Sequence, residues 1–243
     1  MIFHDTHIHL DLMKHRQDTI KNLEHNKVYS IAVTNLPTIF QHNKITIPES
    51  KCIKHALGYH PELVKDYPDL LPVFKKELKK TRYIGEIGID GSSGNRESIE
   101  IQEQIFSSIV SWCNDAGGKI LTIHSRRAEK KIINILGDDF NGEVILHWYS
   151  GNISNLEIAI KNGYWFSVNL AMLKSQKGKE IIKKIPLNKL LVETDSPFGV
   201  SENKLDYGFI YKQIIKGIAT IKEMNYLIVE TALDDNFREL LRQ

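Results

Sequence analysis

Short runs of apolar residues recur along the chain, and the stretches between them repeat apolar residues at the spacing of a helix. The clearest helical stretches are 97–116, with Ile105 and Ile109 on its apolar face, and 126–136, with Ile132 and Ile133. The short runs indicate strands, and they lie at 2–9, 30–34, 55–59, 83–89, 119–124, 143–148, 165–169 and 190–194. Strands alternating with helices predict parallel βα units, and this number of units favours a closed α/β fold, a single (β/α)8 TIM barrel.

An open doubly wound sheet is the competing architecture, because it is built from the same units. Such sheets commonly carry a glycine-rich phosphate loop after a strand, and neither GxGxxG nor a P-loop follows any of these runs. The length of 243 residues is usual for one barrel, and no internal repeat or Pro/Gly/Ser-rich linker divides the chain. We therefore expect one domain over residues 1–243.

Charge and cysteine content narrow the class of protein. The formal net charge is only +2, which excludes a protein that coats nucleic acid through bulk charge, so any phosphate binding must be local. Cys52 and Cys113 match neither a CxxC pair nor a zinc spacing, which indicates reduced thiols. The N-terminus lacks the apolar run of a signal peptide, and no apolar segment is long enough to span a membrane. We expect a cytoplasmic protein without a membrane partner.

Histidines gather where the predicted strands end. Five of the ten lie at or just after such an end: His7, His9, His60, His124 and His147. In a barrel these ends meet at one face, so residues far apart in sequence converge there. His7 and His9 also form an HxH pair, which a strand presents on one side. Alone, such a pair is a weak signal, since it is also what two polar residues at a strand end look like, but several histidines at one rim favour a metal site.

Two carboxylates complete this pattern. Glu86 lies inside the apolar run YIGEIGID, where an unpaired carboxylate in a barrel interior would be strongly destabilising, so it needs a cation. The alternative is that Glu86 faces outward and pairs with Lys or Arg. Asp195 ends the run LLVETD and suits a metal ligand, a general base or both. We interpret Asp90, at the end of the Glu86 run, as a turn or helix-entry residue.

The donor set indicates hydrolysis with divalent metal ions. Histidine and carboxylate ligands suit Zn, Mn, Fe or Mg, and a pair of such ions activates water near neutral pH. Arg126 and Arg127 follow His124 directly, where a guanidinium could bind a phosphate, and His60 could donate to a phosphate oxygen. These features suggest a phosphodiester, although either arginine could equally be a solvated residue at a helix start.

Taken in order, the motifs resemble those of the TatD family of metal-dependent deoxyribonucleases, within the amidohydrolase-like barrels. The matching segments are DTHIHLD at 5–11, GYHPE at 58–62, GEIGID at 85–90, IHSR at 123–126, HWYSG at 147–151 and ETDSP at 193–197. Together they extend over nearly the whole chain. The chain departs from the family's usual pattern at 198–209, at Trp148 and at Gly91, so substrate contacts there are open.

The resemblance implies specific roles. His7, His9 and Asp195 would hold one ion and His124 and His147 the other, with Glu86 bridging the two ions. It further implies an enzyme supported by Mg or Mn, with Zn as another candidate, that removes nucleotides from DNA ends in a 3′-5′ exonuclease-like manner. His60 and Arg126 would bind the substrate near the scissile phosphate, and Glu86, Asp195 and His60 would be catalytic.

Some local strings, including ALGYHPE and WFSVN, resemble the TatD-like members of bacterial Qat anti-phage defence systems. This implies a defence role beside other proteins of the Qat operon. Two other functions stay open. One is a metal-dependent amidohydrolase or deacylase acting on an amide, lactone or aminoacyl ester. The other is a subunit of a defence complex whose metal site is mainly structural.

Overall fold

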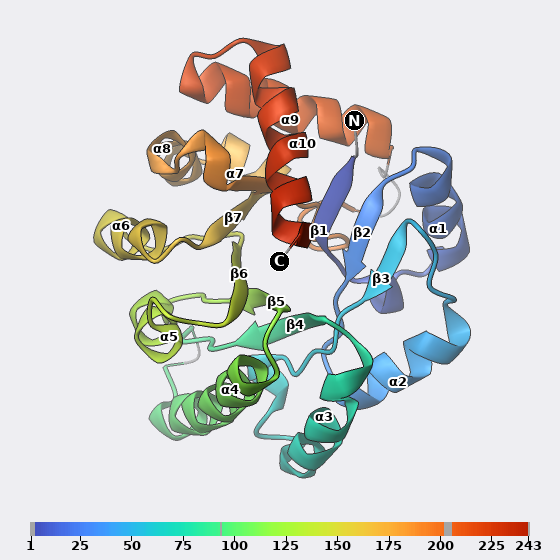
Figure 1. Ribbon diagram of the computed structural model, residues 1–243, viewed down its shortest axis with the longest axis vertical. Coiled ribbons are helices and arrows are strands. Elements are labelled where there is room, and N and C mark those ends of the chain that lie inside the picture. The colour runs from blue at the N-terminus through green and yellow to red at the C-terminus, as the bar shows by residue number, and fades with distance from the viewer. Residues whose placement is uncertain (1–2, 93, 202–205, 243) are drawn as a thin grey trace.

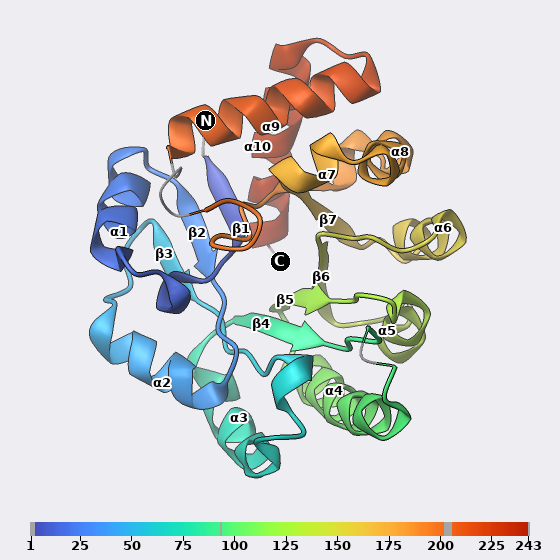
Figure 2. The same ribbon diagram turned by 180° about the vertical axis from the view of Figure 1, so that it is seen from behind.

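Parallel strands form a ring in the computed structural model, which describes residues 3–92, 94–201 and 206–242 (Figures 1 and 2). The eight strands in these ranges are β1 His4–Ile8, β2 Tyr29–Ala32, β3 Ile53–His55, β4 Tyr83–Gly88, β5 Lys119–His124, β6 Gly142–His147, β7 Trp165–Val168 and β8 Leu190–Val192. Almost every strand residue is buried, as expected for strands covered on both faces. The predicted α/β barrel is confirmed.

Hydrogen bonds between neighbouring strands run around the ring. Strands β1 to β3 pair in one arc and strands β4 to β8 in a second. Leu57, just after β3, joins the arcs: it donates to Tyr83 O and accepts from Gly85 N, at 2.9 and 2.8 Å. On the opposite side Asp195 N donates to His7 O at 2.9 Å, which ties the end of β8 to β1. The residues that follow one strand therefore lie beside the ligand candidates of another.

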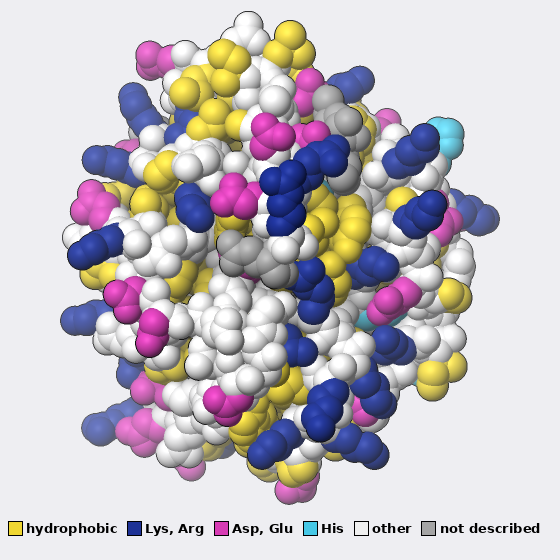
Figure 3. Space-filling view, in the orientation of Figure 1, with side chains coloured by type: hydrophobic (Ala, Val, Ile, Leu, Met, Phe, Trp, Pro, Cys, Tyr) yellow, Lys and Arg dark blue, Asp and Glu magenta, His cyan; other side chains and the backbone are white. Residues whose placement is uncertain are grey.

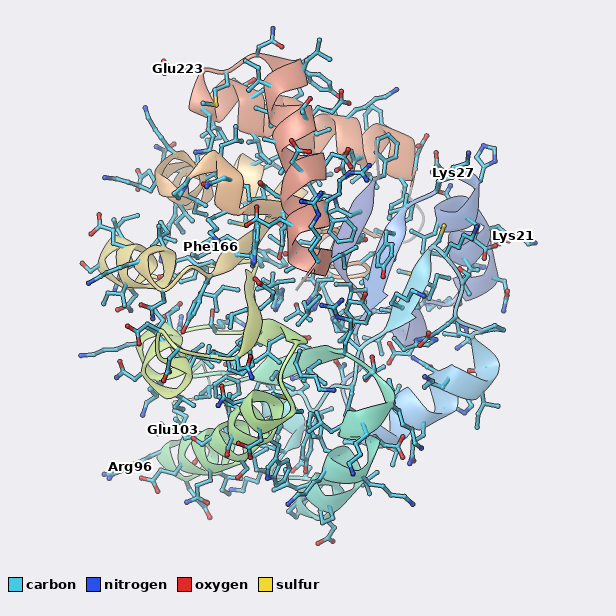
Figure 4. The ribbon with its side chains drawn as sticks, in the orientation of Figure 1. Lys21, Lys27, Arg96, Glu103, Phe166 and Glu223 are labelled. Atoms are coloured by element: carbon cyan, nitrogen blue, oxygen red, sulfur yellow. The ribbon has the colours of Figure 1, made fainter. Side chains whose placement is uncertain are left out.

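Helices surround the ring, and they pack on it through apolar faces. The α-helices are α1 Arg16–His25, α2 Pro37–Thr46, α3 Leu71–Glu77, α4 Arg96–Ala116, α5 Glu129–Leu136, α6 Ile153–Lys161, α7 Leu170–Lys174, α8 Gln176–Lys184, α9 Tyr207–Lys222 and α10 Tyr226–Arg242. Short 3-10 turns are η1 Leu10–Leu12, η2 Pro61–Leu63, η3 Pro68–Leu70, η4 Leu78–Lys80 and η5 Leu187–Lys189. In α4, Arg96 and Glu103 extend outward, whereas Phe166 of β7 lies inside the helical layer (Figure 4). No helix of the described residues has the length and apolar character needed to cross a membrane.

Helix α10 closes one end of the barrel (Figure 1). Its Phe237 and Leu240 are fully buried against side chains from inside the ring, among them Tyr83 and Trp165, the first residues of β4 and β7. Phe237 also stacks on His4 at the start of β1, with ring centroids 4.4 Å apart. Lys and Arg alternate with Asp and Glu over this face of the molecule (Figure 3). Because α10 covers the end where the strands begin, a site is expected at the opposite end, where the strands finish.

Several predicted boundaries differ from the structure, among them those of the third strand, α5 and the eighth strand. The third strand is Ile53–His55 and not 55–59, because Leu57 leaves the pairing with β2 and bonds to β4 instead. Helix α5 begins at Glu129 and not at Arg126, because Arg127 has a left-handed φ of 55° that a right-handed helix does not accommodate. The eighth strand ends at Val192, before Glu193 and Thr194. Residue 2, included in the first predicted strand, lies outside the described residues.

Candidate metal centre

A cavity of about 540 Å³ opens at the carboxyl ends of the strands. Such a position is where barrels gather residues from several strand ends. Polar and aromatic side chains line it: His9, His60, Glu62, Glu86, His124, Ser125, Arg126, His147, Trp148, Ser150, Asp195 and Phe198. The six sequence-predicted ligand candidates lie in this cavity or directly against its wall, since buried His7 contacts His9 and Glu86.

His7 and His9 bring two ring nitrogens together on the β1 side of the cavity. The Nε2 atoms lie 3.3 Å apart, and both rings are buried. Asp195 arrives from the end of β8, with Oδ1 at 3.7 Å from His7 Nε2 and 3.5 Å from His9 Nε2. Its φ of 46° is left-handed, so the chain turns sharply where this carboxylate enters the site. One ligand atom from each of the three residues therefore faces a common point.

Glu86, on β4, has one carboxylate oxygen on each side of the cavity. Oε2 lies 3.5 Å from His7 Nε2 and 3.4 Å from His9 Nε2. Oε1 instead lies 2.8 Å from His124 Nδ1 and 3.0 Å from His147 Nε2. The alternative in which Glu86 faces outward toward Lys or Arg is wrong, since the side chain is buried among histidines. This arrangement is that of a carboxylate able to bridge two cations.

The histidines and carboxylates shift one another's acidity. Burial raises the pKa of Glu86, but His60, His147 and His7 outweigh it and hold the pKa well below its usual value. Burial lowers the pKa of His9, but Asp195 and Glu86 outweigh burial and raise the pKa to about 9. Burial and the neighbouring His147 lower the pKa of His7. The cluster is thus a strongly coupled set of charges in a buried place, which is typical of a functional site.

The spacing of these atoms fits a shared cation better than direct hydrogen bonds. The separations around His7, His9, Asp195 and Glu86 Oε2 range from 3.3 to 3.7 Å, longer than good hydrogen bonds. Ligands about 2.1 Å from one tetrahedral ion lie roughly 3.4 Å from each other. The residues therefore fit a metal ion. Two further groups could also hold one: the first is His7, His147 and Glu193, and the second is His60, Glu86 and His124.

The predicted substrate-binding residues lie in different positions. His60 Nε2 is 3.4 Å from Glu86 Oε1, so His60 faces the centre of the cluster. Arg126 is exposed and lines the cavity. Arg127 is also exposed, but it does not line the cavity, and its backbone is left-handed, with a φ of 55°. The structure thus separates the two neighbouring arginines.

Two aromatic side chains stand at the mouth of the cavity. Phe198 is 64% exposed and lies edge-on to His9, with ring centroids 5.3 Å apart. Trp148, where the sequence departs from the family's usual pattern, is half-buried and lines the same cavity. Part of the departing segment 198–209 lies outside the described residues, at 202–205. The mouth therefore offers flat apolar surfaces next to the charged cluster.

Sequence reasoning missed a layer of residues behind the cluster. Asp90 is not merely a turn residue, because its Oδ2 lies 2.6 Å from His124 Nε2. Thr122 Oγ1 lies 2.8 Å from His7 Nδ1, and Glu193 Oε2 lies 3.8 Å from His147 Nδ1. A signal existed in part, since Asp90 and Glu193 are acids in or beside the same strand-end motifs. Partners of this kind orient metal-binding histidines.

Buried Asp5 braces β1 against β8 next to the cluster. Its carboxylate accepts from Thr194 Oγ1 at 2.6 Å, from Thr194 N at 2.9 Å and from His7 N at 3.2 Å. Burial raises the pKa of Asp5 to about 7 despite these hydrogen bonds. The contacts hold the backbone N–H of His7 and of Thr194, the residue before Asp195.

Comparison with known proteins agrees with this architecture. A family model described as TatD related DNase matches residues 4–242. The uncharacterized metal-dependent hydrolase YabD of Bacillus subtilis is 28% identical over 257 aligned positions, which cover 100% of this chain and 99% of YabD. Human deoxyribonuclease TATDN3 is 28% identical over 156 residues, covering 58% of this chain and 57% of that protein.

A solved structure has the same fold. The crystal structure of the TatD homolog YjjV from Escherichia coli matches with a TM-score of 0.83 and 21% sequence identity, covering 98% of this chain and 97% of that one. The family match spans every strand and the whole histidine and carboxylate cluster. The chain belongs to the TatD-related DNase family and is a metal-dependent hydrolase.

Proposed function

We propose that the chain binds two divalent ions and hydrolyses phosphodiester bonds at DNA ends. His7, His9 and Asp195 would hold one ion, and His124 and His147 would hold the other. The observation that carries this proposal is Glu86, whose two carboxylate oxygens face the two groups of histidines separately. A carboxylate placed in this way is suited to bridging two ions.

The chemistry follows from the residues around this bridge. When bound, a pair of divalent ions lowers the pKa of a water molecule and offsets the charge of a phosphate. Asp195 accepts the proton of the attacking water on its carboxylate, as a general base. His60 donates a hydrogen bond to a non-bridging phosphate oxygen, and Arg126 binds the phosphate from the cavity wall. The water oxygen bonds to phosphorus, the P–O3′ bond breaks, and the leaving O3′ takes a proton from solvent, to which Asp195 returns the proton that it accepted.

DNA is the favoured substrate for two reasons. The matching family is described as TatD related DNase, and human TATDN3 is named a deoxyribonuclease. The cavity also combines a cationic residue, Arg126, with the aromatic surfaces of Trp148 and Phe198. Cationic and aromatic side chains together are typical of sites that bind single-stranded nucleic acid. We propose 3′-5′ removal of nucleotides, with Mg, Mn or Zn as the ions.

The test is cleavage of labelled oligonucleotides by the purified, metal-stripped chain after Mg, Mn or Zn is returned. Single- and double-stranded DNA with a 5′ label should shorten stepwise from the 3′ end. Glu86→Gln should lose several kcal/mol of transition-state stabilisation, about 1000-fold in rate. Glu157→Gln is the matched control, because it makes the same chemical change on the exposed surface of α6.

Other outcomes would overturn the proposal in different ways. A folded wild-type chain that binds ions but leaves DNA intact, and instead cleaves amides, lactones or aminoacyl esters, would favour an amidohydrolase or deacylase. Binding of ions with no turnover of either class would favour a defence-complex subunit whose metal site is structural. Equal DNA cleavage by Glu86→Gln and the wild type would place the activity outside this cluster.

The biological setting is also a proposal. The similarity of ALGYHPE and WFSVN to TatD-like Qat proteins supports a role in bacterial anti-phage defence with other Qat proteins. Free thiols at Cys52 and Cys113 support a cytoplasmic setting. Phe237 of α10 stacks on His4 of β1, and α10 packs against residues inside the barrel. These contacts between elements far apart in sequence support one domain over residues 1–243. Phage plating on cells carrying the operon with wild type or Glu86→Gln tests the defence role, and equal plating on both would contradict it.

A further inference from the structure

His124 is held between two carboxylates, one on each ring nitrogen. Nδ1 lies 2.8 Å from Glu86 Oε1, on the cavity side, and Nε2 lies 2.6 Å from Asp90 Oδ2. A neutral imidazole carries one N–H, and only the bare nitrogen can ligate a metal. The position of the proton therefore decides whether Nδ1, the nitrogen on the cavity side, can ligate a metal ion.

The two carboxylate oxygens of Asp90 have different partners, and one of them faces the His124 ring. Its Oδ1 accepts from Ser92 N at 2.7 Å, and its own N–H donates to Gln102 Oε1 of α4 at 2.7 Å. Gln102 Nε2 in turn donates to Ser98 Oγ at 3.2 Å. Asp90 is 2% exposed, so solvent does not compete strongly for these bonds. With Oδ1 occupied, Oδ2 is the oxygen that faces His124.

A carboxylate accepts hydrogen bonds and does not donate them when ionised. Both ring nitrogens of His124 face a carboxylate oxygen, but Asp90 Oδ2 lies closer, at 2.6 Å against 2.8 Å for Glu86 Oε1. Glu86 Oε1 also faces His147 Nε2 at 3.0 Å. The neutral ring therefore keeps its proton on Nε2, toward Asp90, and leaves Nδ1 bare. Nδ1 is also the nitrogen that faces Glu86, the proposed bridge. Strands β4 and β5 lie side by side in the ring (Figure 2). Their pairing therefore brings Glu86 and Asp90 to the two sides of the His124 ring.

We infer that Asp90 is a positioning residue, which fixes His124 as the Nε2–H tautomer and so presents Nδ1 to a metal ion, while Gln102 holds the Asp90 backbone in place. The inference rests on the proposed function only for the presence of an ion at His124. It gives Asp90 no contact with substrate. It predicts that the ion served by His124 depends on Asp90 and that the ion served by His7, His9 and Asp195 does not.

Asp90→Asn tests the tautomer directly. The Ser92 N–H needs an acceptor, so the amide oxygen takes that position and the amide NH₂ faces His124 Nε2. This arrangement favours the Nδ1–H tautomer, which directs a proton at the ion position. Nitrogen-15 NMR of the histidine rings, in metal-free protein at alkaline pH, distinguishes the two tautomers. A spectrum of His124→Gln identifies the His124 signals among those of the ten histidines.

Metal binding gives the second readout. Titration of the metal-free chain with Mn or Zn should show one site weakened about 10- to 100-fold in Asp90→Asn and the other unchanged. Asp115→Asn, the same change at an exposed position of α4, is the control and should bind both ions like the wild type. An Asp90→Asn chain that keeps the Nε2–H tautomer and binds both ions like the wild type would overturn the inference.

A second variant, Gln102→Met, and a measurement without metal complete the test. If Asp90→Asn does not fold, Gln102→Met loosens the anchor and leaves the carboxylate, and it should weaken the same site several-fold. Unchanged binding in folded Gln102→Met would then count against the inference. The tautomer is read without metal or DNA, so a wild type that fails to cut DNA refutes the proposed function and leaves the role of Asp90 separately measurable.

Discussion

Metal ions should stabilise the fold strongly, because the candidate ligands come from distant parts of the ring. His7 and His9 belong to the β1 region, Glu86 to β4, His124 to β5, and Asp195 follows β8. These groups converge only in the folded chain, so an ion binds the native state and hardly the unfolded state. Removing the ions with a chelator should therefore lower the melting temperature.

The size of the effect follows from mass action. An ion present at about a hundred times its dissociation constant stabilises the native state by about 2.7 kcal/mol, so two ions contribute about 5.4 kcal/mol. For a chain of this size each kcal/mol shifts the melting temperature by about 2–4 °C, which gives roughly 11–22 °C in total. A chain that binds one ion should gain about half of that.

Differential scanning calorimetry with and without added ion measures this shift. Wild type and the surface control Glu157→Gln should show the full gain. His124→Gln and Asp195→Asn should each keep about half, since each is expected to remove a different ion. Comparing the gain within each variant cancels its effect on the metal-free chain. A full gain in both ligand variants, or none in the wild type, would refute the assignment of ions to this cluster.

Three further predictions concern single side chains. Arg126→Ala should raise the KM for DNA about 10- to 100-fold through loss of a charged hydrogen bond, whereas Arg127→Ala should leave it unchanged; equal effects in steady-state assays would remove the distinction between them. Phe198→Ala should raise the KM for single-stranded DNA several-fold, on the order of 1 kcal/mol or more of lost stacking, without changing hydrolysis of a small aryl phosphodiester. A loss on both substrates would instead indicate damage to the cluster. Burial raises the pKa of Cys113 from 9.0 to about 12, so the unfolded chain ionises first and stability should fall as pH rises from 9 toward 12. Urea unfolding of wild type and Cys113→Ala measures this fall, and parallel pH profiles would contradict it.

The convergence of the candidate ligands could be expected from the sequence, because a barrel brings the ends of its strands together at one face. His124 and His147 end strands β5 and β6, and Glu86 lies within β4, so knowing the strands was enough to expect their convergence. The third strand was placed too late, since the apolar run 55–59 does not reveal that Leu57 bonds to β4. The start of α5 was also missed, because helical periodicity does not reveal the left-handed backbone at Arg127.

The role of Asp90 depended on a finer feature, the register between β4 and β5. Gly88 lies opposite His124, and Ile89 N donates to His124 O at 3.1 Å, which brings the next residue beside the imidazole. No periodicity in one strand specifies that register. Reading Asp90 as a turn residue was therefore right about its place in the chain and incomplete about its contacts.

The two glycines of GEIGID, Gly85 and Gly88, nevertheless indicate this register in the sequence. A Cβ at Gly85 would lie 2.1 Å from Thr122 Cγ2, and a Cβ at Gly88 would lie 2.0 Å from His124 O. Both distances are too short for a side chain, so each glycine marks a close approach of β5. The motif thus places its carboxylates relative to β5, with Glu86 between the two contacts and Asp90 just beyond the second. An acid two residues after such a glycine is a candidate partner for the histidine that ends the neighbouring strand.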